Sequence, residues 1–172
     1  PIQSGSDKIL KLMNRKYNIE EFKNIVNKIR NVRPDINLTT DLIVGFPEET
    51  DEDFNETYNN LIDIGFSKIH TFPYSKRDNT PAALMKQVDD NIKKIRVHKI
   101  LELSDRLETK YYNKFINKEL DVLVEEVKDS VSIGHTSNYM KIIINEELEH
   151  NKFYKVYIYN IENNNIYGEI RY

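Results

Sequence analysis

The chain has 172 residues, 31% of them charged, with only five glycines and five prolines, so it is long enough to bury a core and lacks the composition of a disordered protein. Its formal net charge of -3 gives no general attraction to nucleic acid, so any RNA contact would be focused on one patch. It has no cysteine, which excludes a disulfide framework and any cysteine-ligated metal or cluster within the chain.

The ends and hydropathy of the sequence indicate a segment of a non-membrane protein. The first residue is Pro1 rather than methionine, and Pro1 to Ser6 is typical of the exit from a strand that lies upstream. We therefore expect the middle of a longer protein. No apolar run approaches the roughly 20 residues that a membrane span needs, and no signal peptide is visible.

The first part of the chain predicts helices and strands in alternation. Apolar residues at helical spacing predict helices over about 7–15, 19–32 and 51–64. Short β-branched or aromatic runs predict strands over 42–44 and 66–72. This order favours a parallel sheet with right-handed crossovers. Two complete strands cannot close a barrel, so we expect a fragment of a larger α/β unit.

A long charged helix is predicted next, from Val88 to about Phe115. Its expected apolar stripe consists of Ile92, Ile95, Leu101, Leu103 and Leu107. The same periodicity predicts buried faces on the second and third helices. The positions are Phe22, Ile25, Val26 and Ile29 on the second, and Phe54, Thr57, Tyr58, Leu61 and Ile62 on the third.

The period then changes to that of strands. Four apolar runs predict strands over 120–125, 139–144, 153–159 and 166–170. Four or five short strands suggest a small antiparallel barrel. We therefore predict two domains, residues 1–112 and 113–172.

The stretch from Thr39 to Thr50, TTDLIVGFPEET, is the first candidate binding segment. A strand, a tight turn and a helix start bring backbone to a ligand at the carboxyl end of a sheet, although an ordinary connecting loop has the same pattern. Asp41 could contact a ligand or be a structural polar group, while Glu48 and Glu49 fit solvated surface better. Common nucleotide and zinc motifs are absent: the sequence contains no GxxxxGK[ST], GxGxxG or HExxH.

Further candidates follow the next strand. His70 fits a hydrogen-bonded core residue or a base, and Arg77 fits a carboxylate or phosphate ligand or a surface ion pair. Arg15 is explained equally well by the dipole of the helix that it ends. In the second domain, Gly134 to Tyr139 is expected to be an exposed loop leading into a strand, and tyrosines with Lys141 are typical of single-stranded RNA contacts or of core.

Taken together, four segments resemble the methylthiotransferase family of radical S-adenosylmethionine enzymes. They are PIQSGSDKILKLMNRKY, TTDLIVGFPEETDEDF, HTFPYSKRDNTPAA and the helix over 87–101 that contains Arg96. The resemblance covers nearly the whole chain, and HTFPYSKR with GHTSNYMKI is most similar to the branch acting on threonylcarbamoyladenosine in tRNA.

The resemblance implies a fold, a reaction and partners. The fold is the C-terminal part of an incomplete TIM-like barrel followed by a TRAM domain, a small RNA-binding β-barrel. The reaction adds a methylthio group at C2 of N6-threonylcarbamoyladenosine in tRNA, with S-adenosylmethionine, two 4Fe-4S clusters and an electron donor, in the cytoplasm.

The resemblance also implies site residues. The expected S-adenosylmethionine contacts are Gln3, Ser4, Arg15, Asp41, Ile43, Gly45, Phe46, Pro47, Phe72, Tyr74 and Ser75. The expected tRNA contacts are Arg77, His135, Asn138, Tyr139 and Lys141. No catalytic or metal-binding residue is assigned within the chain.

Two departures from the family pattern matter. The cluster-binding cysteine motif is absent, so we expect the isolated chain to be inactive. The usual GFPGET turn has Glu48 in place of its second glycine; if that position needs a positive φ, the strain amounts to roughly 1 kcal/mol. The alternatives are isopentenyladenosine as the substrate and a non-catalytic tRNA-binding module.

Overall fold

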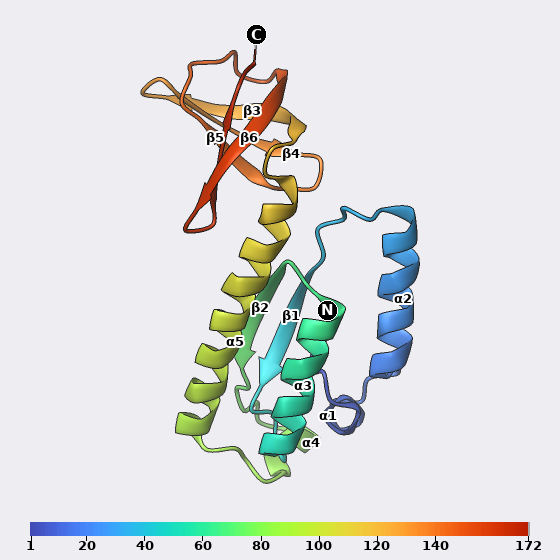
Figure 1. Cartoon of the computed structure of the whole chain (residues 1–172). Coiled ribbons are helices and arrows are strands. Elements are labelled where there is room, and N and C mark those ends of the chain that lie inside the picture. Colours follow the sequence, from blue (N-terminus) through green and yellow to red (C-terminus); the bar gives the residue numbers. More distant parts are fainter. Residues whose placement is uncertain (172) are drawn as a thin grey trace. The chain divides into compact units, whose positions relative to one another are not determined.

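The computed structural model describes residues 1–171, which form two compact units (Figure 1). The first unit is Pro1–Leu107, and the second begins at Glu108. The division therefore falls inside the long helix, whereas the sequence had placed it at the end of that helix. None of the helices in the described residues is long and apolar enough to cross a membrane.

The first unit alternates helices with two strands. Its elements are α1 (Asp7–Leu12), α2 (Ile19–Val32), β1 (Thr39–Val44), α3 (Asp51–Ile64), β2 (Lys68–Pro73), α4 (Pro81–Leu84) and the start of α5 (Asp90–Tyr112). The two capped helices begin where the sequence predicts, because Asn18 and Thr50 each form a capping box with the residue three positions on. Helix α1 is shorter than predicted and ends at Leu12.

Strands β1 and β2 pair in parallel and carry the core on one face. Leu42, Val44 and Ile69 are at most 2% exposed and pack with apolar residues of α3 and α5. The backbone N–H of Ile69 donates to the Ser104 hydroxyl at 3.0 Å, which fixes α5 against β2. Residue Gln3 adds a parallel bridge on the other side of β1, so three chain segments run side by side.

The helix faces agree only in part with those that periodicity predicts. The buried positions that it predicted correctly are Val26, Phe54, Thr57, Leu61, Leu103 and Leu107.

Other predicted positions are exposed. Ile95 is 57% exposed and Ile25 is 56% exposed. Ile92, Leu101, Ile29 and Ile62 are also exposed, by 37% to 46%. On α5 the buried positions include Lys93 and Arg96 beside Ile100, Leu103 and Leu107. The prediction missed Lys93 and Arg96 because ion pairing lets charged side chains occupy buried positions, which hydropathy alone cannot show.

The second unit is a closed five-stranded barrel. Its elements after α5 are a 3₁₀ turn (Asn113–Phe115), β3 (Glu119–Lys128), β4 (Val131–Thr136), β5 (Lys141–Ile144), β6 (Phe153–Glu162) and β7 (Asn165–Glu169). The strand order is β3-β4-β5-β7-β6. All neighbouring pairs are antiparallel except β5 and β7, which are parallel, so the expectation of an antiparallel barrel needs this correction.

Strand β4 is a second correction, since the sequence had placed Gly134, His135 and Thr136 in a loop. A Cβ built on Gly134 would lie 2.2 Å from the Leu123 carbonyl oxygen, so the glycine permits close approach of two strands. Asp129 and Ser130 both have positive φ, as a two-residue hairpin turn requires. The glycine that suggested a loop is therefore a strand residue.

Candidate functional site

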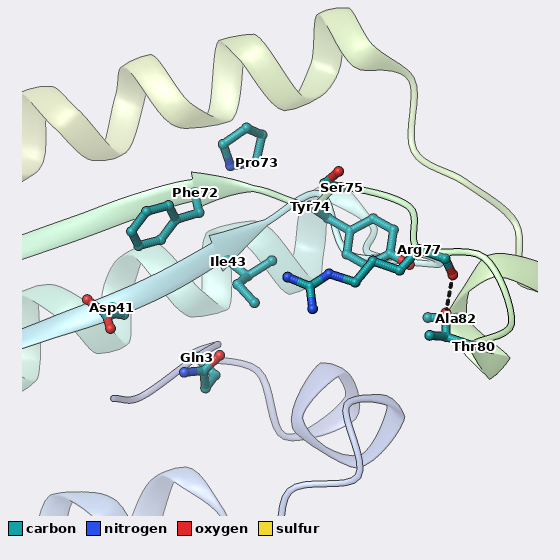
Figure 2. Close-up of a pocket in the computed structure, with 10 residues that line it drawn as sticks. All are labelled: Gln3, Asp41, Ile43, Phe72, Pro73, Tyr74, Ser75, Arg77, Thr80 and Ala82. Carbon is teal, nitrogen blue, oxygen red and sulfur yellow. Dashed lines mark hydrogen bonds between the residues drawn. The ribbon is translucent and has the colours of Figure 1, made fainter.

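A hollow of about 590 Å³ lies beside β1 and β2, at the end where both strands finish (Figure 2). Its lining residues come from the segment before α1, from β1, and from β2 with the loop that follows it. They are Gln3, Asp41, Ile43, Phe72, Pro73, Tyr74, Ser75, Arg77, Thr80 and Ala82. The volume falls in the range of about 300–1,000 Å³ that is typical of small-molecule sites.

Strand alternation explains which side chains face the hollow. Leu42 and Val44 point into the core, so Asp41 and Ile43 between them point to the opposite face. Phe72 is paired in register with Ile43 and is 53% exposed on the same face. The wall is thus an apolar pair with a carboxylate beside it.

Aromatic and cation–π contacts hold Tyr74, which follows β2 at the end of this wall. The backbone N–H of Tyr74 donates to the Val44 carbonyl at 2.8 Å and continues the pairing of the strands. The Tyr74 ring meets Phe46 edge-on at 5.1 Å between centroids, and Lys93 Nζ lies 5.7 Å from the Tyr74 ring centroid. These contacts fix the orientation of a ring that lines the hollow.

Gly45 allows the turn after β1 to fit under α5. Its φ is +70°, and a Cβ there would lie 2.4 Å from Lys93 Cγ. Its N–H donates to Glu49 Oε1 at 2.8 Å. A side chain at position 45 would therefore have to displace Lys93 and adopt a strained backbone.

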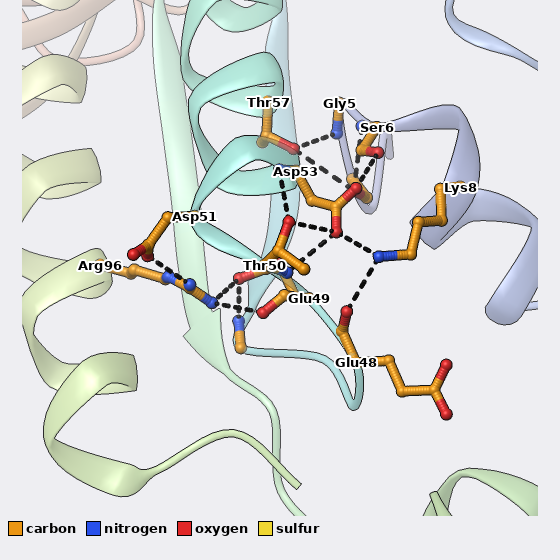
Figure 3. Close-up of polar contacts among 12 residues, drawn as sticks. Gly5, Ser6, Lys8, Glu48, Glu49, Thr50, Asp51, Asp53, Thr57 and Arg96 are labelled. Carbon is orange, nitrogen blue, oxygen red and sulfur yellow. Dashed lines mark hydrogen bonds and ion pairs between the residues drawn. The ribbon is translucent and has the colours of Figure 1, made fainter. Parts of the chain in front are cut away.

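The same Glu49 oxygen accepts a hydrogen bond from Arg96 Nη1 at 2.6 Å (Figure 3). Arg96 Nη2 also contacts Asp51 at 2.8 Å, whereas the buried Arg96 Nε has no partner among the described residues. Burial raises the pKa of Glu49, although the Gly45 N–H and Arg96 act in the opposite direction. Glu49 is only 6% exposed, so its interpretation as solvated surface was wrong.

Glu48 adopts the left-handed conformation that the sequence pattern suggested, with φ of +66°. Its N–H donates to the Lys86 carbonyl at 3.0 Å, and its own carbonyl accepts from Lys8 Nζ at 3.1 Å. Lys8 also contacts Asp53 at 2.6 Å (Figure 3). The turn is therefore held on both sides of a strained residue.

Asp53 is the second carboxylate that organises this region. Burial opposes its ionisation, but hydrogen bonds from Lys8 and Thr50 outweigh it and lower the pKa of Asp53. The Asp53 carboxylate also accepts from the Ser6 hydroxyl at 3.2 Å. It thereby connects the start of α3 to the segment that carries Gln3.

The structure brings together six of the expected cofactor residues at the hollow: Gln3, Asp41, Ile43, Phe72, Tyr74 and Ser75. The expected tRNA residue Arg77 lies there too, and its side chain extends toward Ile43 (Figure 2). Its guanidinium has no partner among the described residues.

The other expected cofactor residues do not line this hollow. Ser4 is fully buried and accepts from the Ser6 N–H at 3.2 Å. Gly45, Phe46 and Pro47 are buried behind the wall, and Arg15 is exposed after the end of α1. Gly45, Phe46 and Pro47 therefore support the wall from its buried side, and Arg15 makes no contribution to the hollow.

In the barrel the expected tRNA residues divide into one buried residue and three that are accessible. Asn138 is 8% exposed, and its Nδ2 donates to the Tyr111 hydroxyl at 3.0 Å, so it supports the barrel. Tyr139 is 84% exposed with φ of +59°, Lys141 is exposed, and His135 pairs with Glu125. Three of the four therefore remain accessible to a partner.

Sequence reasoning missed several residues that shape the hollow. Pro73, Thr80 and Ala82 line it, whereas only their neighbours Phe72, Tyr74, Ser75 and Arg77 were expected to contact a ligand. Lys93 and Glu49 gave no usable signal, because a charged residue on a helix or turn is normally solvated. Among the described residues, no group of three or more His, Cys, Asp or Glu side chains could hold a metal ion.

Comparison with known proteins gives consistent matches. The family described as Radical SAM superfamily matches residues 1–61. The chain is 46% identical over 149 residues to "Threonylcarbamoyladenosine tRNA methylthiotransferase MtaB" of Bacillus subtilis, covering 83% of this chain and 33% of that protein.

Two other relatives are named for a different substrate. The chain is 48% identical over 140 residues to "tRNA-2-methylthio-N(6)-dimethylallyladenosine synthase" of Acetivibrio thermocellus, covering 79% of this chain and 29% of that protein. It is 38% identical over 174 residues to the protein of the same name from Endomicrobium trichonymphae, covering 99% and 41%. The chain thus spans about a third of the length of the curated relatives that it matches.

Replacing Glu48 by glycine should stabilise the protein by about 1 kcal/mol, because glycine adopts a positive φ without the steric cost of a Cβ. The midpoint of urea unfolding measures this change. Glu48→Ala is the matched control: it removes the same carboxylate but keeps the Cβ, and it should give no gain. An equal gain in both variants would show that charge, not backbone strain, is responsible.

Replacing Arg96 by methionine should destabilise the protein by about 3 kcal/mol at pH 7, because Glu49 is left buried without its cation. Burial raises the pKa of Glu49 in the folded protein. Protonation of Glu49 therefore favours the folded state fully below its unfolded pKa of about 4.3, and this contribution is lost as the pH rises through the folded-state pKa. The cost should therefore shrink when unfolding is measured near pH 4. Lys94→Met, at an exposed position of the same helix, should show neither effect.

Proposed function

This chain belongs to the radical S-adenosylmethionine tRNA methylthiotransferases, and from that membership we propose that it supplies the cofactor-positioning and tRNA-gripping part of such an enzyme. In this proposal, residues 1–112 are the C-terminal part of an incomplete TIM-like barrel, and residues 113–172 are a TRAM-like RNA-binding barrel. The full enzyme adds a methylthio group at C2 of an N6-modified adenosine in tRNA. A tRNA and an electron donor are its partners.

The observation that carries this proposal is the hollow beside β1 and β2. Six residues expected to contact S-adenosylmethionine come from three separate chain segments and line one space of about 590 Å³. Ile43 and Phe72 offer an apolar surface to a nucleobase, and Gln3, Asp41 and Ser75 offer polar groups to hydroxyl or amino groups. The lining therefore fits a nucleoside that carries a charged amino-acid tail.

The residues of this chain bind and orient rather than react. When bound, S-adenosylmethionine supplies the radical and methyl-transfer chemistry of the family. Asp41 would accept hydrogen bonds from the ligand, and Tyr74 would close the top of the site in the orientation that Phe46 and Lys93 give it. Holding the reacting atoms in a fixed geometry is the contribution of such a site to rate.

The iron–sulfur clusters do not fit the residues present here. The chain has no cysteine, and its described residues contain no alternative cluster of metal ligands. The ligands would have to come from elsewhere in the enzyme. We therefore propose that the chain on its own performs no methylthiolation.

The barrel would contribute to tRNA binding through exposed side chains. Tyr139 is 84% exposed, Phe153 is 72% exposed and Tyr159 is 42% exposed. Aromatic side chains of this kind stack on unpaired bases, and Lys141 can meet a phosphate group, as can Arg77 at the hollow of the first unit. The net charge of -3 favours binding by such local contacts over a general electrostatic attraction.

A second candidate function is a tRNA-binding module without catalysis, favoured by the lack of any cysteine. Both candidates expect the chain alone to bind tRNA in a salt-dependent manner and to leave it unmodified. Adding the remainder of the enzyme, with reconstituted clusters and a reductant, distinguishes them. Appearance of the methylthio nucleoside by mass spectrometry supports the enzyme, and its absence supports the module.

Replacing Asp41 by asparagine in the reconstituted full-length enzyme should raise the KM for S-adenosylmethionine about tenfold or more, because a charged acceptor is lost from the site. Release of 5′-deoxyadenosine at increasing cofactor concentration measures the change. Asp63→Asn, an exposed acid on α3, is the matched control and should leave the KM unchanged. An unaltered KM in Asp41→Asn would remove Asp41 from the cofactor site.

A further inference from the structure

We propose that Asp41 and His70 form a polar subsite that reads the N6 substituent of the target adenosine. This subsite selects a substituent bearing hydroxyl and carboxylate groups, such as threonylcarbamoyl, over an apolar dimethylallyl group. The inference rests on the proposed function, and it gives a role to a histidine that the cofactor contacts leave unused.

The two side chains are neighbours in the sheet. Asp41 and His70 are register partners in the parallel pair of β1 and β2. Adjacent strands lie about 4.8 Å apart, so the two side chains project side by side. Both residues are exposed, and no described residue makes a hydrogen bond or ion pair with either side chain. Within residues 1–171, the two polar side chains thus lie next to each other and neither makes a contact of this kind.

Alternation places the pair on the face that carries the hollow. His70 is two residues before Phe72, which lines the hollow, and its neighbour Ile69 is buried in the core. Asp41 itself lines the hollow at the end opposite Thr80 (Figure 2). His70 therefore extends the polar surface beside Asp41, away from the Tyr74 end of the site.

The hydrogen-bonding capacity of the pair matches one substituent better than the other. The Asp41 carboxylate only accepts hydrogen bonds, and an imidazole donates at least one. A threonylcarbamoyl group offers N–H and hydroxyl donors to Asp41 and a carboxylate acceptor to His70. A dimethylallyl group offers carbon atoms to both, and it would take both polar groups out of water without replacing their hydrogen bonds.

Overall sequence identity does not choose between the two substrates. The chain is 46% identical to a relative named for threonylcarbamoyladenosine and 48% identical to one named for dimethylallyladenosine. In this proposal the choice depends on residues of the chain that face the substituent. Asp41 is shared with the expected cofactor contacts, so His70 is the residue whose substitution isolates the effect.

The test compares His70→Phe with the wild type in the reconstituted full-length enzyme. Two preparations of one tRNA serve as probes, carrying either threonylcarbamoyladenosine or dimethylallyladenosine at the same position. We expect kcat/KM for the threonylcarbamoyl tRNA to fall at least tenfold and the ratio of the two substrates to shift toward dimethylallyl by a similar factor. His98→Phe is the matched control, since His98 is exposed on α5 and contacts only the Lys94 carbonyl of its own helix.

Further measurements separate the possible outcomes. His70→Gln keeps a hydrogen-bond donor and should restore part of the preference, which a purely structural role would not predict. A parallel fall for both tRNAs with an unchanged ratio would overturn the inference. So would a rise in the KM for S-adenosylmethionine, because it would assign His70 to the cofactor. A wild-type enzyme that modifies neither tRNA would instead overturn the proposed function.

Discussion

The buried ion pair between Arg96 and Glu49 is the interaction on which the geometry of the hollow depends. Both side chains are at most 4% exposed, and their charged atoms lie 2.6 Å apart. Neither charge would be tolerated there alone, since an unpaired ion in the interior costs several kcal/mol. Because Arg96 belongs to α5 and Glu49 to the turn after β1, the pair fixes the turn to the helix. The Gly45 N–H on the same carboxylate oxygen extends this link to the end of β1.

The wall of the hollow follows from that link. With the turn fixed, Lys93 lies over Gly45 and reaches the Tyr74 ring, and Phe46 packs against the edge of the same ring. Asp41, Ile43 and Phe72 are then placed by strand alternation alone. The surface that a ligand would contact is therefore oriented by Lys93, Arg96 and Glu49, which do not line the hollow themselves.

The sequence predicted what local chemistry determines and missed what tertiary contacts determine. Capping residues such as Thr50 fixed the helix starts, and the positive φ of Glu48 followed from the glycine that usually occupies its place. Glu49 and Lys93 could not be assigned, because only the folded chain supplies the partners that let charges be buried. Strand β4 was missed because glycine is typical of loops, while Gly134 serves here to let two strands approach closely.

Closure of the barrel determines which groups of the second unit are available to bind a partner. Among the described residues each of the five strands is hydrogen-bonded to two neighbouring strands, so the sheet closes on itself, although the ends of β3 and β6 pair on one side only. Side chains on the outside of the barrel and in its turns therefore offer most of the surface that a partner can recognise. Closure leaves only short strand ends for strand addition or edge-to-edge aggregation, and the specificity of the unit can change by point substitution without altering the fold.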